Sequence, residues 1–252
     1  MCFLNAYVNN AHEEQAAAAI AIEFPHLLVS LSSCVNPTFR EYERVCATAF
    51  DAYVRPKIVR YIKQLEKGLV HEGNGARLHL MQSGGGIASA KMTMATPVSM
   101  FLSGPAAGVI ATRYVGEMSS RENLVGFDVG GTSTDVCLIR NGKAQITREG
   151  RIGKYPLRVP MVDMDTVGSG GGSIAWIDDA GGLHMGPESA GSFPGPACYN
   201  RGGTKPTSSD AIMSLGYLNP EYFADGTFDL YPQLSEKVIS ELGQQLGLSV
   251  SE

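Results

Sequence analysis

The sequence predicts an α/β fold in which a mixed sheet is flanked by helices. Segments expected to be strands alternate with expected helices through residues 1–120, which indicates α/β layers. Glycine runs follow several of the expected strands, and strand ends are where α/β folds make their ligand contacts. The composition, 44% hydrophobic and 18% charged, is typical of a globular protein with a core.

The first elements are predicted from short apolar runs and from intrinsic propensity. Residues 3–8 and 27–31 are apolar segments that favour strands. Residues 11–23, which are rich in alanine, favour a helix between them. Residues 39–70 repeat apolar side chains at a helical period and predict a long helix. Pro56 should kink or divide this helix because proline removes a backbone donor.

Two later strand ends open onto serine and glycine. Asn74–Gly75 should end the long helix, and a strand over residues 77–81 then runs into Ser83 and Gly84. A later strand runs into Gly104, and both segments precede expected helices. Helix N-termini offer free N–H groups and a partial positive charge to phosphate. The alternative is that these residues only cap the helices.

Residues 124–148 predict three antiparallel strands joined by two tight turns. The first strand ends at Asp128, and the return strand begins at Asp135. Asn141–Gly142 predicts a type I′ turn into a third strand, residues 143–148. The first turn contains residues that permit close backbone approach or supply hydroxyl groups: Gly130, Gly131, Thr132, Ser133 and Thr134.

This first turn is the strongest candidate for a nucleotide site. Hydroxyl and N–H groups bind phosphate oxygens, and flanking carboxylates bind a divalent cation directly or through water. Asp128 and Asp135 are therefore the candidate catalytic and metal-binding residues, and the five turn residues are candidate phosphate ligands. The alternative is an ordinary hairpin built from residues that favour turns.

A second glycine-rich segment, residues 166–173, precedes another expected strand. It is either a tight turn or a loop whose backbone lies against a ligand. Asp163 and Asp165 lie two residues apart, so on a strand they share one face and are candidates for a shared cation. A surface pair of carboxylates is the alternative. The candidate ligand contacts in the loop are Gly170, Gly171 and Gly172.

Four other residues have competing interpretations. Asp210 either caps a helix or belongs to the site. His184 has no second histidine near it, which favours a structural role over metal binding. Cys198 has no histidine close in sequence that would activate it as a nucleophile. Trp176 is expected in the core.

Bulk properties exclude some classes of partner. The net charge of −5 and the lack of a basic run argue against nucleic acid. The apolar stretches are too short to span a bilayer, so a membrane partner is not expected. Five scattered cysteines without a C-x-x-C pair indicate reduced thiols and a cytoplasmic protein.

Distinctive motifs lie at residues 41–44, 81–86, 102–108, 128–135, 166–176, 181–191 and 194–207. Together they resemble the hydantoinase A/5-oxoprolinase family, in the catalytic half of its A-type subunit. That family belongs to the actin-like ATPase, Hsp70 and sugar-kinase superfamily, so the resemblance implies an actin-like (ribonuclease H-like) lobe. The family pattern has a histidine near Asp165, which leaves the metal shell open here.

The resemblance implies an ATP-dependent cyclic amidase that uses Mg²⁺ or Mn²⁺. ATP would phosphorylate the carbonyl oxygen of a lactam or hydantoin, and water would then open the ring. The alternatives are an acetone-carboxylase-type subunit, or a nucleotide-binding or assembly module without catalysis of its own. A plain sugar kinase is disfavoured by the motifs over residues 186–199.

The resemblance also implies partners. A B-type hydantoinase subunit or domain usually completes the reaction, and an N-terminal lobe with its own glycine-rich hairpin usually precedes this region. We therefore expect a fragment, a single domain or a split subunit, with homo-oligomerisation as a further expectation. Within the chain we expect residues 1–120 and 121–252 to form separate segments, unless they form one continuous domain.

Overall fold

The structure is a computed structural model that describes residues 1–71 and 76–250. It is a mixed α/β protein, as the alternation of segments predicts. Asn74–Gly75, the expected end of the long helix, lies outside the described residues.

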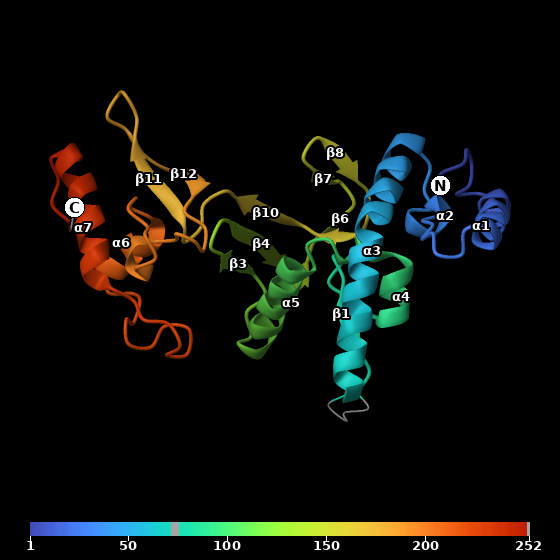
Figure 1. Ribbon diagram of the computed structural model, residues 1–252, viewed down its shortest axis with the longest axis horizontal. Coiled ribbons are helices and arrows are strands. Elements are labelled where there is room, and N and C mark those ends of the chain that lie inside the picture. Colours follow the sequence, from blue (N-terminus) through green and yellow to red (C-terminus); the bar gives the residue numbers. More distant parts are fainter. Residues whose placement is uncertain (72–75, 251–252) are drawn as a thin grey trace. The chain divides into compact units, whose positions relative to one another are not determined.

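The chain folds into two compact units, each built from two stretches of sequence (Figure 1). The first unit combines residues 1–126 and 138–163, and the second combines residues 127–137 and 164–252. In these compact units the chain passes from one unit to the other three times. The expected pair of domains, residues 1–120 and 121–252, has a single crossing and stays a prediction.

Helices dominate the first unit. The longest, α3, contains Pro56 and continues through it, so a division at this proline is wrong, and a kink there stays a prediction. Ala47 and Ile62 lie on either side of Pro56, and both are fully buried. Packing along both halves therefore outweighs the lost backbone hydrogen bond. The helices of this unit are α1 (Ala11–Glu23), α2 (Ser32–Val35), α3 (Glu41–His71), α4 (Ala90–Ala95), the 3₁₀ helix η1 (Pro97–Met100) and α5 (Ser103–Met118).

The two strands expected near the start of the chain are not formed. Residues 3–8 make turns, and residues 27–31 belong to no helix or strand until α2 begins. A strand requires a partner for its backbone N–H and C=O groups. Here a buried side chain, Glu13 of α1, accepts the N–H of Phe3 in the first segment and the N–H of Ser33 in α2, just after the second segment.

Glu13 is fully buried and accepts four hydrogen bonds. The donors are the hydroxyls of Ser32 and Ser33, at 2.6 and 2.7 Å, and the N–H groups of Ser33 and Phe3, both at 2.9 Å. Burial by itself would raise the pKa of Glu13, but these hydrogen bonds outweigh it and lower the pKa.

Replacing Glu13 by Gln should destabilise the first unit by about 1–3 kcal/mol, because the amide leaves buried donors without an acceptor. The folded-state pKa is lowered, so this contribution exists above the unfolded-state pKa and is lost as the pH falls through the folded-state pKa. Urea denaturation at pH 7 and at pH values below about 4 should therefore show the difference between E13Q and the unsubstituted chain shrinking in acid. E23Q, at the exposed end of α1, is the control and should change little. A difference independent of pH would contradict this account.

A β-hairpin replaces the helix that was expected after Gly86. Strands β1 (His79–Met81) and β2 (Ile87–Ser89) pair antiparallel, and α4 begins only after β2. The Ser89 hydroxyl caps α4 by accepting the N–H of Met92. Ser83 and Gly84 therefore lie in a hairpin turn and not at a helix N-terminus.

Helix α5 begins at Ser103, one residue earlier than a cap at Gly104 would require. Leu102 occupies the cap position with a left-handed φ of 58°. Ser103 and the candidate cap Gly104 are already inside the helix. Pro105 lies in the first turn, where its missing N–H has no intrahelical partner to lose.

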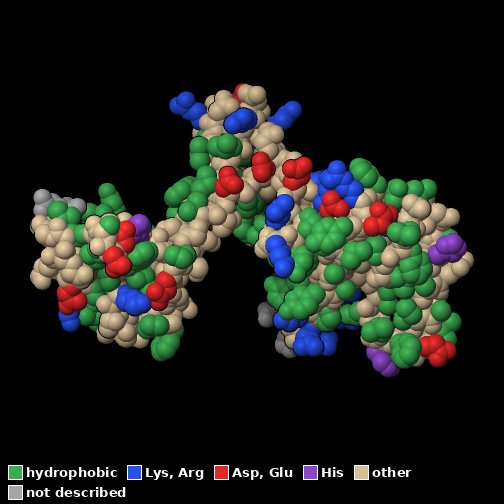
Figure 2. Space-filling view, turned by 90° about the horizontal axis from the view of Figure 1, so that it is seen from above, with side chains coloured by type: hydrophobic (Ala, Val, Ile, Leu, Met, Phe, Trp, Pro, Cys, Tyr) green, Lys and Arg blue, Asp and Glu red, His purple; other side chains and the backbone are tan. Residues whose placement is uncertain are grey.

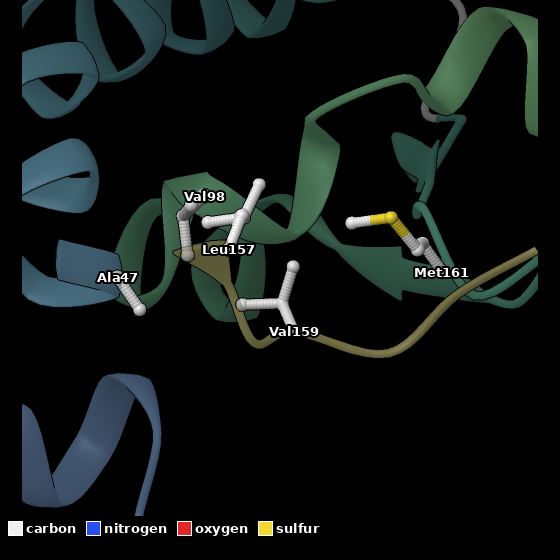
Figure 3. Packing of buried hydrophobic residues seen from close by; sticks show 5 residues of the cluster. All are labelled: Ala47, Val98, Leu157, Val159 and Met161. Carbon is white, nitrogen blue, oxygen red and sulfur yellow. The ribbon is translucent and has the colours of Figure 1, made fainter. Parts of the chain in front are cut away.

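A hydrophobic cluster joins α3 to the strands of the first unit (Figure 3). Ala47 of α3 and Val98 of η1 pack with Leu157, Val159 and Met161, all of which are buried. Figure 3 shows Val98, Leu157 and Val159 pointing toward one another. This cluster holds the chain between residues 138 and 163 in the first unit although it follows the hairpin in sequence.

The predicted antiparallel strands after residue 124 are present. Asn141 and Gly142 both have positive φ, 50° and 68°, which confirms the type I′ turn. The expected third strand is interrupted after Ala144, and Ile146–Thr147 pairs elsewhere. The strands are β3 (Leu124–Val129), β4 (Thr134–Arg140), β5 (Lys143–Ala144), β6 (Ile146–Thr147) with β9 (Met161–Val162), and β7 (Gly150–Ile152) with β8 (Tyr155–Leu157).

The second unit completes the sheet and adds a hairpin and two helices. β10 (Met164–Val167) pairs with β4, which gives the sheet order β10-β4-β3. β11 (Ser173–Ile177) and β12 (Leu183–Ser189) form a separate hairpin. The helices are the 3₁₀ turn η2 (Ala197–Tyr199), α6 (Ser208–Ser214) and α7 (Pro232–Leu246), with α6 and α7 side by side (Figure 1).

None of the helices that the structure describes is both long enough and apolar enough to cross a bilayer. On the face seen in Figure 2, basic side chains are scattered among acidic and hydrophobic ones and do not form a continuous stripe.

Candidate functional site

The candidate phosphate turn connects β3 to β4. The N–H of Gly130 donates to the carbonyl of Ser133 at 2.8 Å and closes the turn. Gly131 and Thr132 form its exposed tip. Thr132 makes no hydrogen bond to any other described residue, so its hydroxyl and N–H groups are free for a ligand. The tip therefore has the free donors that phosphate binding requires.

The glycine loop is fixed against this turn by backbone hydrogen bonds. The N–H groups of Gly171 and Gly172 donate to the carbonyls of Gly130 and Gly131, at 2.9 and 2.7 Å. A Cβ on Gly170 would lie 2.6 Å from the carbonyl oxygen of Gly130. Such an approach is possible only for glycine, so the structure brings the two glycine-rich segments together.

Two hydroxyl groups and one backbone N–H reinforce this contact. Thr134 is buried, and its hydroxyl donates to the carbonyl of Ser169 at 2.6 Å. The hydroxyl of Ser173 accepts the N–H of Gly170 at 2.8 Å. At the start of α6, the N–H of Ser209 donates to the carbonyl of Gly171 at 2.8 Å, and a Cβ on Gly171 would lie 2.8 Å from the Ser209 hydroxyl oxygen. The phosphate turn is thus held in place before any ligand arrives.

These contacts occupy the hydrogen-bonding groups of two sets of predicted ligand residues, whose contact with a ligand stays a prediction. The N–H groups of Gly170, Gly171 and Gly172 all donate within the protein, so the loop does not offer free N–H groups to a ligand. The hydroxyl of Thr134 is likewise engaged by Ser169. The loop supports the turn, and the free donors are at the tip.

The two candidate carboxylates flank the turn on adjacent strands. Asp135 of β4 lies opposite Thr166 of β10 and accepts its hydroxyl at 2.6 Å. Continuing the antiparallel alternation from the Gly130–Ser133 pair places Asp128 of β3 across from Asp135 on the same face. Two carboxylates then lie just below the exposed tip.

The structure does not bring the four candidate metal-binding aspartates together, and metal binding by any of them stays a prediction. Asp163 lies between β9 and β10, outside either strand. Asp165 pairs with Val136, whereas Asp135 pairs with Thr166, the next residue of β10. Successive side chains of a strand point to opposite faces, so the side chains of Asp165 and Asp135 lie on opposite faces of the sheet. Within residues 1–71 and 76–250, no three His, Cys, Asp or Glu side chains gather as a metal site. The carboxylate pair Asp128 and Asp135 remains, which is a sufficient protein contribution for Mg²⁺ when phosphate and water supply the other ligands.

Comparison with known proteins shows to which family the chain belongs. The hydantoinase/oxoprolinase family pattern matches residues 44–252, which include the phosphate turn and the glycine loop. The chain belongs to this family.

Relatives of known activity support the assignment. The caprolactamase subunit alpha of Pseudomonas jessenii is 35% identical over 243 residues, covering 96% of this chain and 35% of that subunit. The crystal structure of the ATP-dependent caprolactamase from Pseudomonas jessenii superposes with a TM-score of 0.76 at 34% identity. The nucleotide-free structure of acetone carboxylase gives a TM-score of 0.76 at 30% identity. Each match covers 99% of this chain and 36% of the solved chain, so this chain spans about a third of the length of these relatives.

Three candidate residues of this hydantoinase/oxoprolinase chain belong to the first unit. Ser83 is buried, and both its N–H and its hydroxyl donate to the carbonyl of Ser99, at 2.7 and 2.6 Å. Gly84 packs against Pro160 in the adjacent loop. Gly104 is exposed at the second position of α5. The contacts of Ser83 and Gly84 are structural, and a role in phosphate binding stays a prediction for all three.

Asp210 is a buried structural centre of the second unit. It lies at the third position of α6 and completes a capping box with Thr207, which is the residue that caps the helix. Its carboxylate also accepts the N–H groups of Ala197 and Cys198, at 3.2 and 2.9 Å, and the hydroxyl of Ser235 at 2.8 Å. With no solvent exposure, it is placed to hold η2, α6 and α7 together.

Cys198 is fully buried, and its pKa is raised to about 12 by burial and by the charge of Asp210. A thiol with such a pKa carries almost no thiolate at neutral pH, so Cys198 is not a nucleophile. Cys198 packs instead in a hydrophobic core cluster with Met213 and Leu230.

His184 and Trp176 form a surface pair on the β11–β12 hairpin. Their rings stack with centroids 4.7 Å apart. Asp178 contacts the His184 ring, and this hydrogen bond lowers the pKa of Asp178. The structural role expected for His184 agrees with these contacts. The expectation that Trp176 is in the core is wrong, because the residue is 43% exposed.

Sequence reasoning missed the residues that support the site. Thr166 donates to the Asp135 carboxylate, Ser169 accepts the Thr134 hydroxyl, and Ser209 donates to the glycine loop at Gly171. The signal that could have found Thr166 is its place in the sequence, two residues before the first glycine of the loop. Ser209 carried no signal, because only folding brings the start of α6 to the glycine loop.

Proposed function

We propose that this chain supplies the phosphate-binding part of an ATP-dependent enzyme that opens cyclic amides. The observation that carries the proposal is the phosphate turn itself: an exposed Gly131–Thr132 tip with free donors, flanked by two carboxylates and fixed by the glycine loop. The support from relatives is that a similar chain is an ATP-dependent caprolactamase, and caprolactam is a cyclic amide. An actin-like lobe is the finer fold assignment that we infer with it.

The proposed reaction overcomes the low reactivity of an amide carbonyl. The carbonyl oxygen takes the terminal phosphoryl group of ATP, and ADP leaves. Water adds to the activated carbon and the ring C–N bond breaks, which leaves an acyl phosphate whose hydrolysis releases phosphate. In such phosphoryl transfers the protein contributes mainly positioning and charge stabilisation.

The residues divide into three roles. The N–H and hydroxyl groups of Gly131, Thr132 and Ser133 hold phosphate oxygens. Asp128 and Asp135 hold Mg²⁺ (or Mn²⁺), directly or through water, and the cation offsets the charge of the phosphates. Gly130, Gly170, Gly171, Gly172 and Thr134 keep the turn in shape.

Isothermal titration of Mg·ATP into this chain tests the proposal. D128A should weaken binding by about tenfold or more, since a carboxylate that holds the cation is removed. D179A, which removes an exposed carboxylate from the β11–β12 turn, is the control and should bind as the unsubstituted chain does.

Equal binding by D128A and the unsubstituted chain would contradict this site. Absence of binding by a folded chain would favour the alternative of a module that needs another lobe to complete the site. We infer such an N-terminal lobe and a B-type partner, in line with the relatives named as subunits. A cytoplasmic location is proposed on the five free cysteines.

A second candidate function is phosphorylation of a ketone enolate, as in a carboxylase. The equal TM-scores to acetone carboxylase and to caprolactamase favour it as much as the first. The phosphate turn serves either reaction, because both transfer a phosphoryl group to an oxygen. Comparing ATP turnover with caprolactam and with acetone, in an assembly of this chain with its partners, separates the two.

A further inference from the structure

A cavity of about 390 Å³ in the first unit contains groups that the proposed reaction does not use. Its walls are the segment Asn36–Phe39 together with Tyr7, Arg148 and Arg158. All of these residues belong to the first unit, whereas the phosphate turn belongs to the second. The cavity combines aromatic walls with cationic side chains.

The charge of this cavity is uncompensated. Arg148 and Arg158 form no salt bridge with any carboxylate of the described residues. Behind the Tyr7 ring lies Arg44, fully buried, with its guanidinium 5.2 Å from the ring centroid. Only one nitrogen of Arg44 has partners, while its Nε and Nη1 have none among the described residues. The Arg44 charge is paired with the Glu41 carboxylate at 3.4 Å, so the cations of the cavity wall that lack a carboxylate partner among the described residues are Arg148 and Arg158.

A buried amide in the cavity wall also lacks a partner. Asn36 is 4% exposed, and its Nδ2 donates to no described residue. Its Oδ1 accepts the hydroxyl of Thr38 at 3.1 Å, which orients the amide. An unpaired buried donor costs free energy, so native structures rarely keep one without a ligand or a water.

We propose that this cavity binds a small oxyanion, a carboxylate or phosphate group attached to an apolar body. Arg148 and Arg158 supply charge-assisted hydrogen bonds to the oxygens, for which the planar guanidinium is suited. Asn36 donates its free N–H to the same group. Tyr7 and Phe39 provide the apolar surface for the rest of the ligand. This site is built from residues of the first unit, whereas the phosphate turn belongs to the second, and it does not depend on the proposed reaction.

Titration of the full chain with benzoate, benzamide and inorganic phosphate, followed by ¹H–¹⁵N NMR, tests the proposal. Benzoate or phosphate should shift the side-chain NH₂ signals of Asn36, whereas neutral benzamide, of the same shape as benzoate, should not. A response to benzoate alone identifies an organic carboxylate, and a response to phosphate alone identifies a phosphate group. No shift with either anion overturns the proposal.

Variants locate the site and separate it from non-specific charge. R148M and R158M should each weaken anion binding by about tenfold. N36D, which places a negative charge at the donor, should abolish it. R151M removes an exposed arginine of β7 that does not line the cavity, so it should leave binding unchanged. Equal weakening by R151M, in chains shown to be folded by circular dichroism, would overturn the proposal, and Mg·ATP binding should be unaffected by all four substitutions.

Discussion

Replacing Gly170 by Ala should weaken Mg·ATP binding by about a hundredfold. The added Cβ would lie 2.6 Å from the carbonyl oxygen of Gly130, 2.7 Å from the N of Ser133 and 2.8 Å from the carbonyl carbon of Thr132. All three atoms belong to the backbone, so none can rotate away. The turn must shift, and a misplacement of about 1 Å is enough to cause a loss of this size in a site that acts by positioning. Overpacking should also destabilise the second unit by about 1–3 kcal/mol.

Gly168→Ala is the matched control for this substitution. Gly168 belongs to the same loop, but a Cβ there would meet no atom within 4 Å. Calorimetric titration of both variants separates loss of the locked turn from a general effect of glycine replacement. If G170A and G168A bind Mg·ATP equally well, the glycine loop does not position the phosphate turn.

Replacing Asp210 by Asn should lower the free energy of unfolding of the second unit by about 3 kcal/mol. One carboxylate oxygen accepts the N–H groups of Ala197 and Thr207 and the Thr207 hydroxyl, at 3.2, 3.1 and 2.7 Å. The other accepts from Cys198 and Ser235. An amide turns one acceptor into a donor, so buried N–H groups on that side lose their partner whichever way it is oriented.

Trp176 gives a direct measurement, because it is the single tryptophan of the chain and belongs to the second unit. Its fluorescence during urea denaturation should report the destabilised unit in D210N. D179N, at an exposed turn next to the tryptophan hairpin, is the control and should leave the midpoint unchanged. A D210N midpoint equal to that of D179N would show that the capping network contributes little.

The sequence by itself determined the turns and helices that depend only on residues close together in the chain. The Asn141–Gly142 turn follows from two residues that tolerate positive φ. The phosphate turn between Asp128 and Asp135 follows from a glycine pair between two strands. The helix over Ala11–Glu23 follows from alanine propensity. The family motifs in turn identified the class of protein, which the match over residues 44–252 bears out.

The tertiary structure decided everything that depends on partners distant in sequence. Apolar character at residues 3–8 and 27–31 predicted strands, but a strand forms only where another strand pairs with it. Glu13 instead binds the N–H of Phe3 in the first segment and the N–H of Ser33 just after the second. Pro56 should divide α3 by local rules, yet burial along both halves outweighs one lost hydrogen bond. In these cases long-range packing and pairing overruled propensity.

The site shows the same division. The spacing of Asp163 and Asp165 suggested a shared cation, but the register of β10 against β4 sends Asp165 to the face opposite Asp135. The glycine loop was predicted to touch a ligand, whereas folding uses its N–H groups to hold the turn formed by Gly130 and Gly131. Sequence determines which chemical groups are available. Strand register and backbone hydrogen bonds join residues that are distant in sequence. They decide which of those groups remain free to bind.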